Sequence, residues 1–200
     1  MLSAVILAAG DSSRMGRPKA LLEWRGLPFI EHVCAALRKA GVEDRVVVLG
    51  KSSAEILAAW HPAGEKVAVN VKPENGQLSS LKAGLLDASP AAEGYMVCLA
   101  DQPTVPADTY KKIIAFWSER KDQVVIPKTF RALDSRFKRG HPVILPASAR
   151  ALCFEAPLEK GLHWVTHHSS VQVADLEVKD PEVIRDFDTP EDYEALVKAG

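Results

Sequence analysis

This sequence of 200 residues lacks several features that mark disulfide-rich, zinc-binding and nucleic-acid-binding proteins. Its three cysteines, Cys34, Cys98 and Cys153, lie far apart and form no Cys-x-x-Cys pair, which argues against a disulfide framework and a zinc site. Cys34 and Cys98 lie among apolar residues, so we expect them in the core. The formal net charge is −1, which gives no general attraction to nucleic acid or to anionic membranes.

Long hydrophobic runs are also missing. No apolar stretch approaches the length of about 18 residues that a transmembrane helix needs. The chain starts directly with strand-like residues, without the basic region and cleavage site of a secretory signal. We therefore expect a cytoplasmic protein that inserts into no membrane.

The fingerprints of three common kinds of enzyme are missing too. Between residues 10 and 19 the chain has only Gly10 and Gly16, so the Gly-x-Gly-x-x-Gly motif of dinucleotide-binding enzymes is not formed. Gly16 is followed by Arg-Pro-Lys-Ala, which is not the Lys-Ser/Thr ending of a P-loop. No Gly-x-Ser-x-Gly elbow is found. These absences disfavour a dinucleotide-dependent oxidoreductase, a P-loop NTPase and a serine hydrolase.

The chain does contain short β-rich apolar runs that alternate with helical patterns. Several runs are continuously apolar, which is typical of strands buried on both faces. The alternation predicts one α/β domain, residues 1–200: a Rossmann-like three-layer sandwich with a mostly parallel sheet. We expect strands at 5–7, 45–49, 67–71, 95–99, 124–126, 143–145 and 171–176, and a basic loop over 130–140. We expect helices over 30–37, 53–60, 78–86 and 106–117, and one that begins after Thr189.

The loop that follows the first predicted strand carries the strongest chemical signal. In open α/β sheets, ligands bind beyond the carboxyl ends of the strands, where loops meet helices. Ser13, Arg14 and Lys19 offer a hydroxyl and two cations, which together with backbone amides suit a phosphate group. An ordinary connecting loop with solvated cations is the alternative interpretation.

Two aspartates are placed to bind a divalent cation. Asp101 directly follows a predicted buried strand, and Asp188 directly precedes the capped final helix. Mg²⁺ prefers one or two carboxylates together with substrate phosphates. Turn or helix capping would explain either residue alone, although Thr189 is the better cap of its helix.

Two further polar groups have both a functional and a structural interpretation. Gln77, Ser79 and Ser80 open a predicted helix, where polar groups contact a base, a ribose or a phosphate, or merely cap the helix. His141 lies between a glycine and a proline, as either a site residue or a packed loop residue.

Taken together, "LAAGDSSRMGRPKALL", "NGQLSSLKAGL", "LADQP", "GHPVILP" and "FDTPEDYEAL" resemble the motifs of the MobA-like nucleotidyltransferases, most closely the molybdenum cofactor cytidylyltransferases. The resemblance covers nearly the whole chain, in the family's order, and the first motif is highly specific for the superfamily. It implies a fold of the nucleotide-diphospho-sugar transferase type. It also implies transfer of CMP from CTP to the terminal phosphate of molybdopterin or the molybdenum cofactor, with release of pyrophosphate.

The resemblance further implies a role for each motif residue. The nucleotide would contact Leu7, Ala8, Ala9, Gly10, Ser13, Arg14, Lys19, Gln77, Ser79 and Ser80. Lys19, Arg14 and Asp101 would be catalytic, Asp101 and Asp188 would bind Mg²⁺, and His141 and Gly140 would line the acceptor site. Guanylyl-transferring relatives commonly have glycine where this chain has Ala9, and this difference favours CTP over GTP.

One segment departs from the family pattern. Many cytidylyltransferases carry Gly-Asp-x-Gly-Ala-Arg where residues 158–163 read Leu-Glu-Lys-Gly-Leu-His. If this segment touches the acceptor, the departure weakens the pterin assignment and leaves nucleotide transfer intact. The alternatives are transfer onto a sugar phosphate or another small phosphate, and a non-catalytic carrier of the molybdenum cofactor. Both cofactor roles imply a transient molybdoenzyme client.

Overall fold

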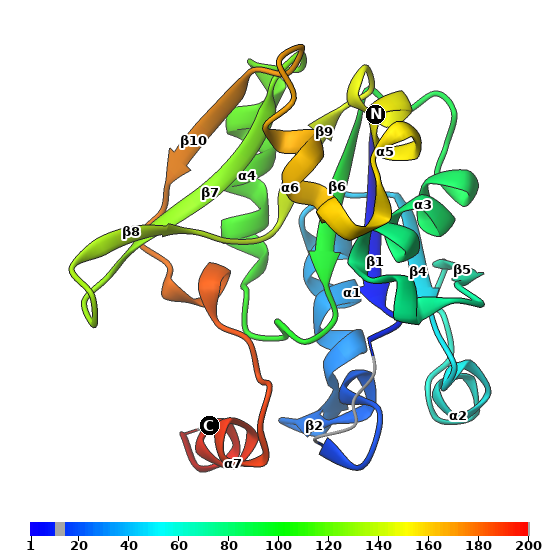
Figure 1. The fold of residues 1–200 in the computed structure, drawn as a ribbon. Helices are drawn as coiled ribbons and strands as arrows, with labels where there is room; N and C mark the ends of the chain where they lie inside the picture. Colours follow the sequence, from blue (N-terminus) through cyan, green and yellow to red (C-terminus); the bar gives the residue numbers. More distant parts are fainter. Residues whose placement is uncertain (11–14, 200) are drawn as a thin grey trace.

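The computed structural model describes residues 1–10 and 15–199, and a central sheet organises it (Figure 1). Within these residues, eight strands join this sheet in the order β10-β7-β9-β6-β1-β4-β5, with β8 paired to β7. The strands are β1 (Leu2–Ala8), β4 (Asp44–Leu49), β5 (Lys66–Val69), β6 (Gly94–Leu99), β7 (Val124–Arg131), β8 (Arg136–Arg139), β9 (Val143–Pro146) and β10 (Val173–Glu177). A separate antiparallel pair is formed by β2 (Glu23–Trp24) and β3 (Leu27–Pro28).

The sheet is mixed but mostly parallel. β1 is parallel to both of its neighbours, β4 and β6, while β5 is parallel to β4 and β10 to β7. β9 runs antiparallel to β6 and to β7, so these two strands point the same way. The carboxyl ends of β1, β4, β6 and β7 therefore reach the same edge of the sheet, where ligands bind in such folds.

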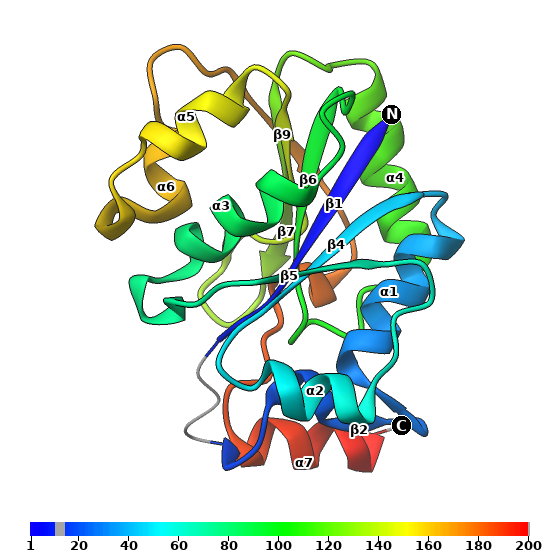
Figure 2. The same cartoon turned by 90° about the vertical axis from the view of Figure 1, so that its right-hand side faces the viewer.

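Helices cover both faces of the sheet (Figures 1 and 2). The helices are α1 (Phe29–Lys39), α2 (Ser53–Ala59), α3 (Gln77–Asp87), α4 (Ala107–Ser118), α5 (Ala149–Glu155), α6 (Gly161–Thr166) and α7 (Pro190–Ala199). On β1, Ala4 and Ile6 pack with α1 and α4, whereas Val5 packs with α3. This alternation along one strand builds two apolar layers around the sheet. The predicted α/β three-layer class is thus confirmed.

Helix α3 approaches the sheet unusually closely because Gly84 has no side chain. A Cβ at Gly84 would lie 2.4 Å from Val5 Cγ1 and 2.7 Å from Val48 Cγ2. The missing Cβ lets α3 lie directly against β1 and β4. The N-terminal residue of this helix, Gln77, lines the same cavity as the residues at the ends of those strands.

The basic loop expected over residues 130–140 was a wrong prediction. β7 continues to Arg131, and β8 returns from Arg136, so this region is an antiparallel hairpin (Figure 1). Phe130 lies opposite Phe137, and their ring centroids are 5.6 Å apart in an edge-to-face arrangement. Such a cross-strand aromatic pair stabilises a hairpin whose charged sequence hides the usual apolar alternation.

Two smaller expectations concern the cysteines and the membrane. Cys34 and Cys98 are buried as predicted, and Cys153 is buried with them. Burial raises the pKa of the Cys153 thiol to about 12, so this side chain stays protonated and behaves as a core residue. In the described part of the chain, no helix is both long enough and apolar enough to cross a bilayer.

Candidate active site

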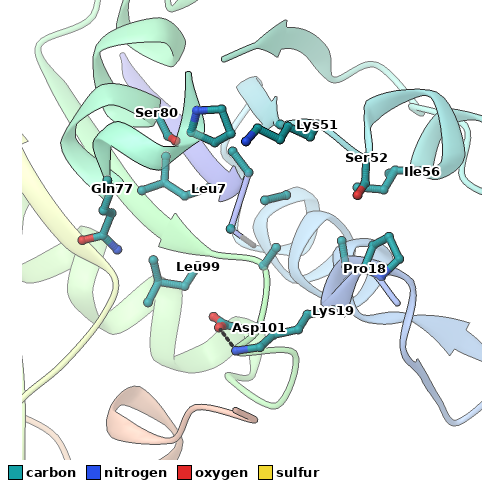
Figure 3. Close-up of a pocket in the computed structure, with 18 of the residues that line it drawn as sticks. Leu7, Pro18, Lys19, Lys51, Ser52, Ile56, Gln77, Ser80, Leu99 and Asp101 are labelled. Atoms are coloured by element: carbon teal, nitrogen blue, oxygen red, sulfur yellow. Dashed lines mark hydrogen bonds and ion pairs between the residues drawn. The ribbon is translucent and has the colours of Figure 1, made fainter. Parts of the chain in front are cut away.

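A cavity of about 430 Å³ lies at the carboxyl edge of the sheet (Figure 3). The ends of β1, β4 and β6 and the N-terminus of α3 contribute its lining. The sequence-predicted site residues that line it are Leu7, Ala8, Ala9, Gly10, Lys19, Gln77, Ser80 and Asp101. Ser13 and Arg14 lie outside the described residues, so their roles stay predictions.

Lys19 joins the two aspartates that the sequence nominates as metal ligands. It begins a short 3-10 turn after Pro18, and its side chain points towards Asp101 (Figure 3). Its Nζ lies 3.2 Å from Asp101 Oδ2 and also donates a hydrogen bond to Asp188 Oδ1. Lys19 and Asp188 are 169 positions apart in the chain. The fold therefore assembles this triad from three distant motifs.

The opposite charges in the triad offset the cost of partly burying each charged group. Burial disfavours the charged ammonium of Lys19, but its hydrogen bond to Asp188 and its attraction to Asp101 together raise the pKa of Lys19. Burial also raises the pKa of Asp101, against the opposing effect of Lys19, and the negative charges of Asp186 and Asp188 raise it further. This concentration of carboxylates attracts cations.

The pair Asp101 and Asp188 fits a hard divalent cation. Both carboxylates contact one ammonium nitrogen, so they are close enough to share one ion. Among residues 1–10 and 15–199, no cluster of three or more histidine, cysteine or acidic side chains could hold a metal alone. The donor set suits Mg²⁺ or Mn²⁺, which complete their shell with substrate phosphates and water. It does not suit structural zinc.

Ser79 lies apart from the residues that line the cavity. Its Oγ donates to the Gly76 carbonyl at 2.7 Å, a bond back to the preceding turn of the chain. The Asn70 amide donates to Ser79 Oγ at 2.8 Å and to Ser80 Oγ at 3.0 Å. Asn70 therefore fixes both hydroxyls, but only that of Ser80 belongs to the cavity lining.

Gly140 and His141 are also outside the cavity lining. A Cβ at Gly140 would lie 1.9 Å from the Val183 carbonyl oxygen, so the chain passes too closely there for any side chain. The backbone amide of His141 donates to the same carbonyl at 2.8 Å. Burial lowers the pKa of His141 to about 4, with Asp186 as the opposing charge. The imidazole is therefore neutral near pH 7, and its acceptor role stays a prediction.

Sequence reasoning missed the loop after β4. Gly50, Lys51 and Ser52 line the cavity beside the turn around Pro73 and Glu74, and Lys51 Nζ lies 3.2 Å from Glu74 Oε2. A Cβ at Gly50 would lie 2.7 Å from the Ala9 carbonyl oxygen, so a glycine lets this loop approach the end of β1. The sequence predicted a strand at 45–49. Because ligands bind beyond the carboxyl ends of such strands, residues 50–52 could have been predicted as part of the site.

Comparison with known proteins assigns the chain to a family. Residues 4–173 match the MobA-like NTP transferase domain. The chain belongs to this family. It is 34% identical to the molybdenum cofactor guanylyltransferase of Xanthomonas euvesicatoria pv. vesicatoria over 75% of each chain. It is 27% identical to the Escherichia coli molybdenum cofactor cytidylyltransferase over 96% of this chain and 93% of that one. These relatives support the resemblance seen in the motifs.

A different activity is named among the relatives as well. The chain is 31% identical to the nicotine blue oxidoreductase of Paenarthrobacter nicotinovorans, over 74% of this chain and 72% of that one. Relatives at similar identity therefore carry the names of two kinds of enzyme, nucleotidyltransferases and an oxidoreductase. The family match and the two relatives above make this chain a MobA-like nucleotidyltransferase.

Solved structures share the fold of this chain. Rv0371c from Mycobacterium tuberculosis H37Rv has 28% sequence identity and a TM-score of 0.85, with 98% of this chain and 97% of that chain covered. A complex of the same protein with manganese has 26% identity and a TM-score of 0.82, with 100% of this chain and 99% of that chain covered. A structure of this family's fold has thus been solved with a divalent cation.

Proposed function

We propose that this MobA-like protein is a metal-dependent cytidylyltransferase that moves CMP from CTP to the terminal phosphate of molybdopterin or the molybdenum cofactor. One observation carries the proposal. Lys19 at the cavity wall contacts both Asp101 and Asp188, so a cationic side chain and two carboxylates meet where a triphosphate would lie. The cavity volume of about 430 Å³ is in the range of small-molecule sites.

The residues present suit nucleotidyl transfer. An acceptor phosphate oxygen attacks the α-phosphorus of the nucleotide, a new P–O bond forms, and the bond to pyrophosphate breaks. The acceptor is already an anion, so the reaction needs positioning and charge neutralisation rather than a dedicated base. Asp101 and Asp188 would hold Mg²⁺ or Mn²⁺, which neutralises phosphate charge when bound. Lys19 would add a positive charge beside the same phosphates.

The choice of nucleotide rests on the first strand end. Ala8, Ala9 and Gly10 line the cavity, and Ala9 is nearly buried against the loop at Gly50. A methyl group at position 9 narrows the space for a base compared with a glycine there. A smaller pyrimidine therefore suits this site better than guanine, which supports CTP.

A redox reaction is the second candidate, because the relative from Paenarthrobacter nicotinovorans is named an oxidoreductase. Against it stands the sequence of the first loop, which has no Gly-x-Gly-x-x-Gly motif for a nicotinamide dinucleotide. The two candidates differ in the ligand that must bind, so one set of titrations separates them.

The experiment is calorimetric titration of the purified protein with CTP, GTP, UTP and ATP, each with Mg²⁺ or Mn²⁺, and with NADH and NADPH. We expect CTP to bind at least about tenfold more tightly than GTP, which corresponds to about 1.4 kcal/mol. Binding of CTP with metal should weaken in Asp101→Ala, because Asp101 is a proposed ligand of the cation on the phosphates. With molybdopterin as acceptor, the wild-type protein should then release pyrophosphate from CTP.

Other results would favour other functions. Preference for UTP would indicate transfer onto a sugar phosphate, and binding of NADPH without CTP would indicate a redox enzyme. Binding of molybdopterin without pyrophosphate release would indicate a carrier. Each of these three results contradicts the proposed function.

A further inference from the structure

The segment before α7 carries two acidic side chains on either side of a buried aromatic one. Phe187 is fully buried, and its ring lies 5.6 Å from that of Phe29 in an edge-to-face contact. Asp188 bonds to Lys19, and Asp186 bonds to Gln102. Phe187 therefore anchors the segment in the core, while Asp188 meets Lys19 of the site and Asp186 meets Gln102, the residue after Asp101.

Gln102 connects this segment to the turn that carries Asp101. Gln102 is only 3% exposed. Its Nε2 donates to Asp186 Oδ1 at 2.8 Å. A carboxylate only accepts hydrogen bonds, so the amide is the donor and the geometry fixes its orientation. Gln102 directly follows Asp101, and Asp186 lies two residues before Asp188. The bond therefore connects the two segments that carry the proposed metal ligands.

Lys19 alone is an insufficient link between Asp101 and Asp188 during a reaction cycle. In this structure its ammonium neutralises both carboxylates. If it turned towards a triphosphate, a divalent cation would take its place, and the two carboxylates would still have to stay close enough to share that ion. The bond from Gln102 to Asp186 does not involve Lys19, so it persists through that exchange.

We propose that Gln102 is a positioning residue, which holds Asp188 at a fixed distance from Asp101 through its hydrogen bond to Asp186. It touches neither nucleotide nor metal and acts through the segment that Asp186 and Asp188 share. The inference deepens the proposed function, because the pair that Gln102 positions is the proposed metal site.

The first test needs no ligand. Hydrogen–deuterium exchange is followed in a peptide covering residues 185–189 of Gln102→Met, a variant that keeps side-chain length and loses the donor. We expect exchange in this peptide to be several-fold faster than in the wild-type protein, with β1 peptides unchanged. Asp186→Asn keeps an acceptor oxygen for Gln102, so its exchange should stay at the wild-type rate. Gln123→Met, at the amino end of β7, is the matched control.

The second test measures Mn²⁺ binding in the presence of saturating CTP by electron paramagnetic resonance. We expect Gln102→Met to weaken Mn²⁺ binding by about tenfold, the loss typical of one hydrogen bond to a charged group. CTP affinity measured without metal should be unchanged, and Asp186→Asn should stay within about threefold of wild type. A merely destabilising substitution would not separate metal affinity from nucleotide affinity in this way.

The outcomes distinguish this inference from the proposed function. The positioning role is wrong if the wild-type protein binds Mn²⁺ with CTP and Gln102→Met shows the same Mn²⁺ affinity and the same hydrogen–deuterium exchange in residues 185–189. The same holds if Asp186→Asn is as impaired as Gln102→Met. If wild type binds neither CTP nor Mn²⁺, the proposed function fails and the metal-positioning role fails with it, whatever the exchange rates are.

Discussion

Lys19 has two sets of partners available to it, the carboxylates that it contacts in this structure and the phosphates of a nucleotide. Its pKa is raised despite partial burial, so the side chain stays charged in either arrangement. Binding a triphosphate with its divalent cation would exchange one set of partners for the other. The ion would take the two carboxylates, and the ammonium would take the phosphates. At the scale of single residues, the triad would therefore be a preformed acceptor for the metal–nucleotide complex that the proposed function requires.

The roles of Asp101 and His141 make a direct prediction. Asp101→Ala should lower the rate of pyrophosphate release from CTP by about a hundredfold or more, a loss typical of removing one electrostatic contact to the reacting centre. His141→Ala should lower it by less than about tenfold, because His141 lies outside the cavity lining. Initial rates with molybdopterin as acceptor measure both.

Asp44→Ala is a suitable control for these rates, because this aspartate begins β4 and bonds to Ser3 and Lys66, at the amino edge of the sheet. Its loss should affect stability more than pyrophosphate release. Equal losses of rate in Asp101→Ala and His141→Ala would show that the two roles are wrongly assigned.

At the scale of secondary-structure elements, Gly140 links the β7–β8 hairpin to the turn at Pro181–Ile184. A Cβ there would lie 1.9 Å from the Val183 carbonyl oxygen and 2.9 Å from Ile184 Cγ2. Gly140→Ala should therefore push the two elements apart and lower the free energy of unfolding by about 1–3 kcal/mol. Urea denaturation followed by circular dichroism measures this loss.

Gly10→Ala is the matched control for that measurement, because a Cβ at Gly10 would meet nothing within 4 Å in the described residues. Its midpoint in urea should equal that of the wild-type protein. An unchanged midpoint in Gly140→Ala would mean that the turn at Val183 moves aside without cost.

The elements also show where sequence reasoning succeeds and where it stops. Continuous apolar runs identified β1, β4 and β6, because strands buried on both faces leave that pattern. The pattern failed for β8, in which all four residues are exposed and three are cationic. That strand forms through backbone pairing to β7 and through the contact of Phe137 with Phe130. Neither contact leaves a periodic signal in a single sequence.

At the scale of the whole molecule, global stability should depend on pH through His141. Burial lowers the folded-state pKa of His141 to about 4, below the ordinary value of 6.5. The unfolded chain therefore binds a proton at pH 5 that the folded chain does not, and stability falls as the pH drops from about 6.5 towards 4. The expected contribution between pH 7 and pH 5 is about 2 kcal/mol.

Urea denaturation of wild type and His141→Gln at pH 7 and pH 5 isolates this contribution. Other titrating groups are common to both proteins and cancel in the difference. The wild-type protein should lose about 2 kcal/mol more than the variant between the two pH values. Equal losses would show that His141 is protonated in the folded protein at pH 5.

The site itself was predictable residue by residue but not as an arrangement. The motifs nominated Lys19, Asp101 and Asp188 because each follows a strand or precedes a helix, where functional groups concentrate. That one ammonium contacts both carboxylates depends on the order of strands across the sheet, which no motif encodes. Asp186 was not nominated, because its partner Gln102 is distant in sequence and the bond between them has no local signature.

The order of the triad along the chain also has a consequence for biosynthesis. A chain synthesised from its N-terminus contains β1, Lys19 and Asp101 well before Asp188 and α7. Phe187 and Leu196 complete an apolar cluster with Leu22 and Phe29, so that end of the molecule also stays open until then. An unfinished chain on the ribosome therefore has one carboxylate of the pair and no second one. It would bind a nucleotide–metal complex only weakly, and catalytic competence would arrive late in translation.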